Sequence, residues 1–190
     1  MFGLEIKRGA PSKSRRRRLP RGLLGLLAAI LALGCIGSAY ASTIIEQATL
    51  KVKIQGWSYN LEAVIARPAN AAGRLPLVLL THGQPRDKLD RPRMHVDLVT
   101  GQARDMAERG WLAVGFMRRG YGASDGPYAE TYECSMPNAQ RILAAAAEDV
   151  AAVYEVVSQR PDVDTSRVLG MGWSAGGASM LAWAATQPTP

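Results

Sequence analysis

The sequence predicts an α/β fold in which a mostly parallel sheet follows an N-terminal antiparallel hairpin. Apolar and polar residues alternate over 48–65, as expected for strands with one buried face. Three later runs are continuously apolar, which is typical of strands covered on both faces in a parallel sheet. Segments with helical spacing of apolar residues lie between and after these runs. This order of elements predicts a mixed sheet with helices on both faces.

The N-terminal hairpin is predicted from two alternating runs. The first covers 48–55 and the second covers 59–65. The short segment Gly56-Trp57-Ser58 between them is a predicted turn, because a glycine-containing connection between alternating runs is typical of a hairpin. The small residues of 68–73 then form a predicted loop.

The later elements follow from apolar runs and from helix boundary signals. Asn138 is a predicted N-cap, and Arg160-Pro161 is a predicted helix end because the residue before a proline disfavours helical geometry. The polar stretch 86–93 is predicted to be a solvated loop. The predicted strands are 75–81, 111–117 and 167–172, and the predicted helices are 96–109, 139–159 and 175–185.

The positive charge of the chain is concentrated at its start. The whole chain has a net charge of +7, and its first 41 residues hold eight Lys or Arg side chains and one Glu. These residues alone therefore account for the net charge, and the remainder is neutral. A neutral body without a basic stripe argues against nucleic acid as a partner.

Residues 1–41 are typical of an export signal. A basic segment ends at Arg21, an apolar stretch runs from Gly22 to Gly37, and Ala39-Tyr40-Ala41 is a small-x-small cleavage motif. The apolar stretch is shorter than the roughly 20 residues of a membrane span. We expect a signal peptide at 1–41, cleavage after Ala41, one domain at 42–190, and a secreted or periplasmic protein.

Three alternatives for this leader remain open. The arginine run resembles a twin-arginine signal, Gly34-Cys35 resembles a lipoprotein site, and an uncleaved segment would anchor the protein in a membrane. Membrane contact is expected only through this segment. After cleavage Cys134 would be the one cysteine left in 42–190, so no disulfide within that range is expected.

The stretch Gly172-Trp173-Ser174-Ala175-Gly176 is the strongest chemical signal in the chain. It follows an apolar run and precedes a segment of small residues, so it predicts a very tight strand-to-helix turn. Such a turn holds a serine oxygen clear of the backbone, and the helix start points N–H groups at an oxyanion formed beside it. The alternative is a glycine-rich turn with a passive serine.

Two further motifs complete an ordered set. His82-Gly83 ends one buried strand, the glycine-rich segment 119–126 ends the next, and Gly172–Gly176 ends the third. In this order the motifs resemble the α/β-hydrolase family, particularly its dienelactone-hydrolase-like and prolyl-oligopeptidase-like branches. The resemblance covers about 48–186.

The resemblance implies a set of site residues. Ser174 would be the nucleophile, and the backbone N–H groups of Gln84 and Ala175 would form the oxyanion hole. Tyr121 is a candidate substrate-binding residue, with packing within its loop as the alternative. A backbone N–H group can donate whatever side chain its residue carries, so glutamine at position 84 is compatible with this role.

Other polar residues fit a catalytic role less well. His82 is expected to shape the loop after its strand, and His95 is expected at the surface or at a helix start. Asp125 precedes the serine, whereas the family places its acid and then its histidine after it. One departure from the family is Met117, where many relatives carry Asp.

The main departure is the absence of a histidine after His95. A serine hydroxyl is a weak nucleophile without an adjacent base. The sheet would also have an open edge after its last strand. Two expectations follow: the chain is part of a longer hydrolase, or it is a truncated product that is inactive, binds a ligand or needs a partner chain.

The leading functional hypothesis is an exported serine hydrolase that cleaves carboxylic ester or amide bonds through an acyl-enzyme on Ser174. Its substrate would be a small-molecule ester or a peptide. The alternative is a catalytically inactive fragment that acts as a binding module or needs a partner chain. No cofactor is expected, and two separated histidines offer no metal-ligand cluster.

Overall fold

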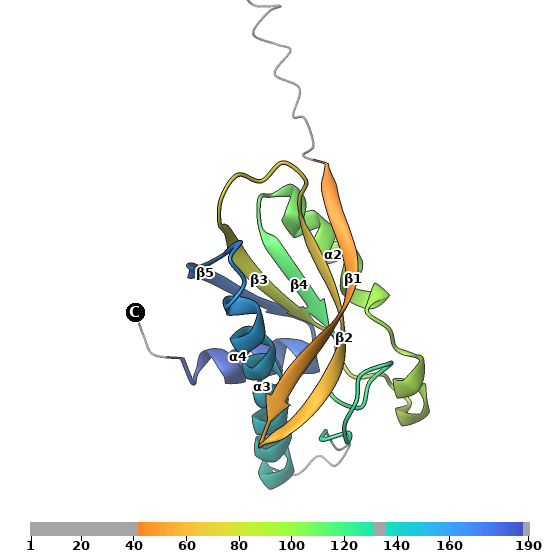
Figure 1. Cartoon of the computed structure of the whole chain (residues 1–190). Helices are drawn as coiled ribbons and strands as arrows, with labels where there is room; N and C mark the ends of the chain where they lie inside the picture. The colour runs from red at the N-terminus through yellow and green to blue at the C-terminus, as the bar shows by residue number, and fades with distance from the viewer. Residues whose placement is uncertain (1–41, 131–135, 188–190) are drawn as a thin grey trace, which may run out of the picture. The chain divides into compact units, whose positions relative to one another are not determined.

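One five-stranded sheet organises the computed structural model, which describes residues 42–130 and 136–187. Within these residues the strand order is β1-β2-β4-β3-β5 (Figure 1). The strands are β1 (Thr43–Ile54), β2 (Trp57–Pro68), β3 (Leu75–Thr81), β4 (Leu112–Phe116) and β5 (Val163–Gly172). The helices are the 3₁₀ helix η1 (Lys88–Arg93), α2 (Asp97–Glu108), α3 (Met136–Ser158) and α4 (Ala175–Ala184).

The sheet is mixed, as the sequence predicts. Strand β2 pairs antiparallel with β1 and with β4. Strand β3 pairs parallel with β4 on one side and with β5 on the other. The parallel part therefore brings the C-terminal ends of β3, β4 and β5 to the same edge of the sheet, where the predicted motifs lie.

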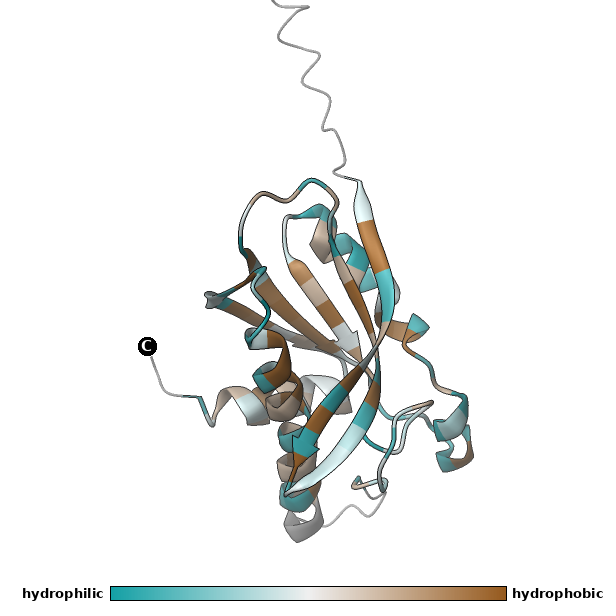
Figure 2. Ribbon diagram, in the orientation of Figure 1, coloured by the Kyte–Doolittle hydropathy of each residue, from teal (hydrophilic) through white to brown (hydrophobic). Residues whose placement is uncertain are grey.

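The two faces of the sheet carry two apolar cores. Along β3, Leu77 and Leu79 point into the core shared with α3 and α4, whereas Val78 and Leu80 point into the core shared with α2. This alternation follows from the period of two in a strand. Helices therefore cover both faces, and the hydropathy colouring shows apolar strands between them (Figure 2).

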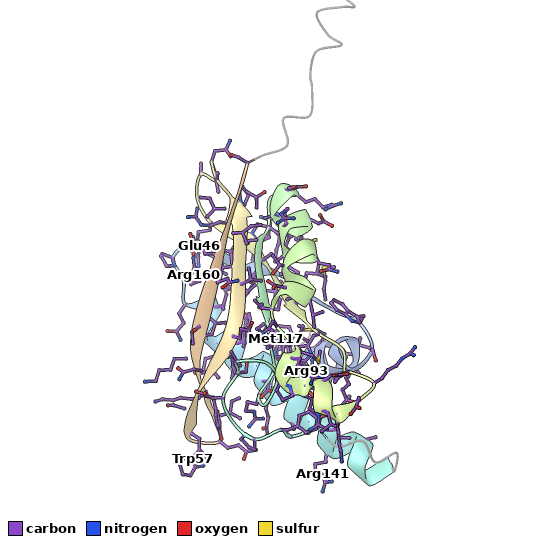
Figure 3. The ribbon with its side chains drawn as sticks, turned by 90° about the vertical axis from the view of Figure 1, so that its right-hand side faces the viewer. Glu46, Trp57, Arg93, Met117, Arg141 and Arg160 are labelled. Carbon is purple, nitrogen blue, oxygen red and sulfur yellow. The ribbon has the colours of Figure 1, made fainter. Side chains whose placement is uncertain are left out.

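The hairpin turn is tighter than expected. Strand β1 ends at Ile54 and β2 begins at Trp57, so Gln55 and Gly56 form a two-residue connection. Both have positive φ, at 52° and 85°, which is typical of a type I′ turn. Trp57 lies beside this turn with 72% of its surface exposed (Figure 3).

Several predicted boundaries were wrong. Strand β1 begins at Thr43 rather than 48, and β5 begins at Val163 rather than 167. Helix α3 begins at Met136, so Asn138 lies inside the helix and is not its N-cap. The predicted polar loop contains η1, whose start is capped by the Asp87 carboxylate, which accepts from the Leu89 N–H.

Some predictions lie outside the described residues. They concern the leader at 1–41 with Cys35, and also Cys134. No helix in the described part of the chain combines the length and the apolar character that a membrane crossing needs.

Candidate active site

The backbone at Ser174 has the geometry of a tight strand-to-helix turn. Strand β5 ends at Gly172 and α4 begins at Ala175, which leaves two residues between them. Ser174 has φ 53° and ψ −128°, a conformation that L-residues rarely adopt. Such a residue costs roughly 1–3 kcal/mol and persists only where the surroundings impose it. The side chain is exposed.

The surroundings impose this turn through close backbone contacts. A Cβ on Gly172 would lie 2.5 Å from the carbonyl carbon of Gly176. A Cβ on Gly176 would lie 2.5 Å from the His82 carbonyl oxygen and 2.6 Å from that of Thr81. The glycines of the motif therefore allow β5, α4 and the end of β3 to meet without side chains between them.

The segment after β3 passes directly beside the serine. We call His82-Gly83-Gln84 the β3 loop. A Cβ on Gly83 would lie 3.3 Å from Ser174 Cβ and 3.3 Å from the Trp173 carbonyl oxygen. The structure thus brings together Ser174, Ala175 at the first position of α4, and the β3 loop that contains Gln84.

Tyr121 is buried in the protein interior and does not lie at the surface. It is 0% exposed, and its hydroxyl lies 3.0 Å from Glu130 Oε2 and 3.3 Å from the Tyr128 hydroxyl. Its ring packs edge-on against the His82 ring, with 4.3 Å between ring centroids. This position fits the loop-packing alternative and leaves Tyr121 without an exposed surface to offer a substrate.

Both ring nitrogens of His82 are engaged by backbone groups. Nδ1 lies 2.7 Å from the Gly83 carbonyl oxygen, and Nε2 accepts from the Arg118 N–H at 3.1 Å. Nδ1 must therefore carry the proton. Burial and the neighbouring Arg118 charge lower the pKa of His82 to about 3. His82 is a structural residue in this arrangement, which agrees with the expectation for it.

A buried ion pair behind the β3 loop was not expected from the sequence. Arg118 is 0% exposed and Glu130 is 3% exposed. The guanidinium donates to both carboxylate oxygens through Nε and Nη2, the latter at 3.1 Å from Oε2. Its Nη1 donates to the His82 carbonyl oxygen at 2.6 Å. The ion pair and the β3 loop are therefore one connected network.

The charges in this pair stabilise each other. Burial alone would raise the pKa of Glu130, but hydrogen bonds and charge from Arg118, with bonds from Gln84 and Tyr121, bring it below the ordinary value. Burial would lower the pKa of Arg118, but Glu130 raises it. Both side chains remain charged at neutral pH, as a buried pair with full hydrogen bonding does.

Neighbouring charged residues anchor the loop after β4. Arg119 pairs with Asp149 of α3, and the Arg119 N–H donates to the same carboxylate. Asp125 accepts from the backbone N–H of Asn60 at 3.1 Å and from its side chain at 2.8 Å. Asp125 therefore holds this loop to β2, which agrees with its exclusion as a catalytic acid.

His95 lies before α2, where its Nδ1 is 3.4 Å from Glu62 Oε1. Its side chain is 54% exposed. The same Glu62 accepts from the backbone N–H groups of Val96 and Ala123, each at 3.0 Å. His95 is thus at the surface beside a helix start, as expected.

A pocket of about 810 Å³ is lined by the side of β5 that faces α4 and by α4 itself. Val168, Met180 and Trp183 line it, but Ser174 does not. Within the described residues, the buried Nε1 of Trp183 has no hydrogen-bond partner. No group of three or more potential metal ligands occurs within the same residues.

Comparison with known proteins identifies the fold. A dienelactone hydrolase-like promiscuous phosphotriesterase from metagenomic libraries matches with a TM-score of 0.55 and 18% identity, over 75% of this chain. An α/β serine hydrolase without lid from Xanthomonas campestris matches with a TM-score of 0.51 and 23% identity, over 74% of this chain. The chain has the α/β-hydrolase fold. A putative dipeptidyl aminopeptidase IV from Bacteroides ovatus also matches this chain, with a TM-score of 0.53, 21% identity and 76% of this chain covered.

The family comparison and the coverage add two facts. Residues 140–190 of this chain match the prolyl oligopeptidase family, and this segment contains Ser174. No match was found among the curated proteins. The chain spans 54% of the metagenomic structure, 56% of the Xanthomonas structure and 20% of the Bacteroides structure.

Proposed function

We propose that this protein, which has the α/β-hydrolase fold, acts as a serine hydrolase on carboxylic ester or amide bonds, with Ser174 as the nucleophile. The observation that carries the proposal is the Ser174 backbone at φ 53° and ψ −128°, held between two glycines at the start of α4. A strained, exposed serine on a strand-to-helix turn is the arrangement that nucleophilic acyl transfer needs.

The proposed reaction has two halves. Ser174 Oγ forms a bond to the substrate carbonyl carbon, and the bond from that carbon to the alcohol or amine breaks as the leaving group takes up a proton. Water then cleaves the acyl-enzyme and restores the hydroxyl. The Gln84 and Ala175 N–H groups would hold the oxyanion, and the loss of one such donor typically costs about 10²–10³ in kcat.

A general base is the missing partner in this proposal. His82 has both ring nitrogens engaged, and His95 lies beside Glu62. We therefore assign the acid and the histidine of the reaction to residues outside this sequence, in a longer chain or in a partner chain. This assignment agrees with a chain that spans about half of the metagenomic structure.

A fluorophosphonate probe tests the nucleophile. Attack by Ser174 Oγ forms an O–P bond and expels fluoride, so a fluorescent probe reports the reaction on a gel. The test uses the complete protein, with the segment or partner chain that supplies the histidine. We expect labelling that is lost in Ser174→Ala and kept in Ser158→Ala, which removes a half-buried serine at the end of α3. Equal labelling of Ser174→Ala and the unaltered protein would disprove the proposal.

A binding role is the second candidate function. It is favoured by the position of β5 as an edge strand and by the pocket between β5 and α4, where Trp183 Nε1 has no hydrogen-bond partner among the described residues. An exposed strand edge is a template for pairing with another chain. A complete protein, with any partner chain present, that folds but is inert to the probe would favour this candidate over the hydrolase.

We also propose export through residues 1–41, with cleavage after Ala41. The support is the tripartite pattern of charge, apolar stretch and small-x-small motif. The mature protein recovered from the periplasm or medium should then begin at Ser42. An intact N-terminus in the membrane fraction would favour the anchored alternative.

A further inference from the structure

We propose that Glu130 is a positioning residue for the reaction. Through the side chain of Gln84 it holds the backbone N–H of Gln84 in place for the oxyanion that forms beside Ser174. The inference rests on the proposed function, because without acyl transfer at Ser174 there is no oxyanion to hold. It adds a role to a residue that would not touch the substrate.

The first step is the tether between Gln84 and Glu130. Gln84 Nε2 lies 2.8 Å from Glu130 Oε2 and 3.1 Å from the Tyr128 hydroxyl. An ionised carboxylate only accepts hydrogen bonds, so the amide nitrogen rather than its oxygen must face Glu130. The side chain of Gln84 is thus directed into the protein, while Gly83, the residue before it, passes beside the serine.

The second step is the rigidity of Glu130 itself. The carboxylate is buried and receives bonds from Arg118, Gln84 and Tyr121. Arg118 is fixed in turn by the Thr81 hydroxyl and the His82 carbonyl oxygen. A charge held by this many donors has one low-energy position, so it is a firm anchor for a side chain that reaches it.

The third step is that each residue of the β3 loop has a bond into this network. The His82 carbonyl accepts from Arg118, the Gly83 carbonyl lies 2.7 Å from His82 Nδ1, and the Gln84 side chain donates to Glu130. Gly83 meanwhile passes against Ser174. The network therefore sets the position of the loop from the side opposite the serine.

Geometry of this kind affects rate more than substrate affinity. An oxyanion donor acts on charge that develops in the transition state, so a displaced donor lowers kcat and leaves KM nearly unchanged. A residue with only a structural role would instead lower the stability of the fold without slowing the folded enzyme. These two effects can be measured separately.

The test uses a pair of matched substitutions in the complete protein, which includes the segment or partner chain that supplies the histidine. Gln84→Asn shortens the tether by one methylene and keeps the backbone N–H. Gln55→Asn makes the same change at the hairpin turn, where Gln55 Nε2 donates to Glu148 at 2.9 Å. Both variants are compared with the unaltered protein for the rate of fluorophosphonate labelling and for the midpoint of urea unfolding.

We expect Gln84→Asn to slow labelling about tenfold, less than the loss of a whole oxyanion donor. Gln55→Asn should react at the unaltered rate. On an activated ester such as p-nitrophenyl acetate, wherever turnover is measurable, the decrease should be in kcat. Glu130→Gln should slow labelling as well, and Gln84→Asn should add little to it because both changes break one interaction.

The outcomes separate this inference from the function on which it rests. Unaltered labelling of Gln84→Asn, with Ser174 still the labelled residue, would overturn the positioning role and leave the hydrolase intact. A lower urea midpoint with unaltered labelling would show that the tether only supports the fold. Labelling of the unaltered protein no faster than Ser174→Ala would overturn both proposals.

Discussion

At the scale of single residues, the site depends on two glycines whose lack of a Cβ allows backbone segments to approach closely. Gly176 lies where a Cβ would meet two carbonyl oxygens, and Gly172 lies where a Cβ would meet Gly176. These contacts hold Ser174 in its unusual backbone conformation. The same contacts set the distance between the serine and the β3 loop.

Gly176→Ala should therefore destabilise the protein and disturb the site together. Its methyl group would be forced against the backbone oxygens of Thr81 and His82, and overpacking of this kind costs typically about 1–3 kcal/mol or more. Urea unfolding should show a lower midpoint, and probe labelling of the folded protein should decrease.

Gly101→Ala is the matched control for that change. Gly101 lies inside α2, is exposed, and has nothing within 4 Å of an added Cβ. Alanine is favoured over glycine in a helix interior by about 1 kcal/mol, so this variant should unfold at a higher urea concentration. A Gly176→Ala protein as stable as the unaltered one would contradict the close approach.

The residues of the site differ in how far the sequence alone could predict them. The tight turn at Ser174 was predictable because it is local and its glycine spacing has a steric cause, whereas the role of Ser174 as nucleophile stays a prediction. The Arg118–Glu130 pair was not, because its members are separated by an irregular loop and charged residues are ordinarily expected at the surface. Two adjacent arginines after a buried strand were the only signal for it.

At the scale of elements, β3 is buried on both faces, whereas its neighbour β5 lies at the edge of the sheet. Strands β3 and β4 were predicted well because continuous apolar runs reflect such burial. The start of β5 was missed because 163–166 is mostly polar and pairs only with the first residues of β3. That pairing depends on tertiary contacts rather than on periodicity.

The difference between a central and an edge strand predicts different costs for the same substitution. Leu79 of β3 is 0% exposed and lies in a core, whereas Leu169 of β5 is 38% exposed. Leu79→Ala should cost about 2–5 kcal/mol of unfolding free energy, as buried leucines do. Leu169→Ala should cost under about 1 kcal/mol, in line with a partly solvated site.

Chemical denaturation of both variants checks this prediction. Circular dichroism gives the unfolding free energy, and the slope of the transition shows whether the surface exposed on unfolding has changed. Leu169 pairs with Val78, so its side chain lies on the α2 face of the sheet. Equal costs for the two leucines would mean that in solution Leu169 is as well covered as Leu79, and would indicate a partner on the α2 face of β5.

At the scale of the whole molecule, two buried titratable groups have opposite effects on stability as the pH falls. Burial and Arg118 lower the pKa of His82 from 6.5 to about 3. The folded state then resists protonation that the unfolded chain accepts, so stability present above pH 6.5 is lost below it. From pH 7 to 5 this loss is about 2 kcal/mol.

Protonation of Asp149 has the opposite effect on stability from that of His82. Burial raises its pKa from 3.8 to about 6, although Arg119 opposes the shift. The folded state takes up this proton before the unfolded chain does, so stability increases as the pH falls through 6. The gain by pH 5 is about 1 kcal/mol, which offsets part of the loss due to His82.

The two effects together predict how a single substitution changes the pH profile. The unaltered protein should lose less than about 1 kcal/mol of unfolding free energy between pH 7 and 5. Asp149→Asn removes the compensating group, so its loss over the same interval should approach about 2 kcal/mol, whatever its stability at pH 7. The comparison uses the change in unfolding free energy with pH, so it remains valid for a variant that is less stable at every pH because Arg119 has lost its partner.

His95→Gln changes an exposed histidine and is the control for histidines in general. Identical slopes in Asp149→Asn and the unaltered protein would show that the ion pair with Arg119, and not burial, controls the ionisation of Asp149.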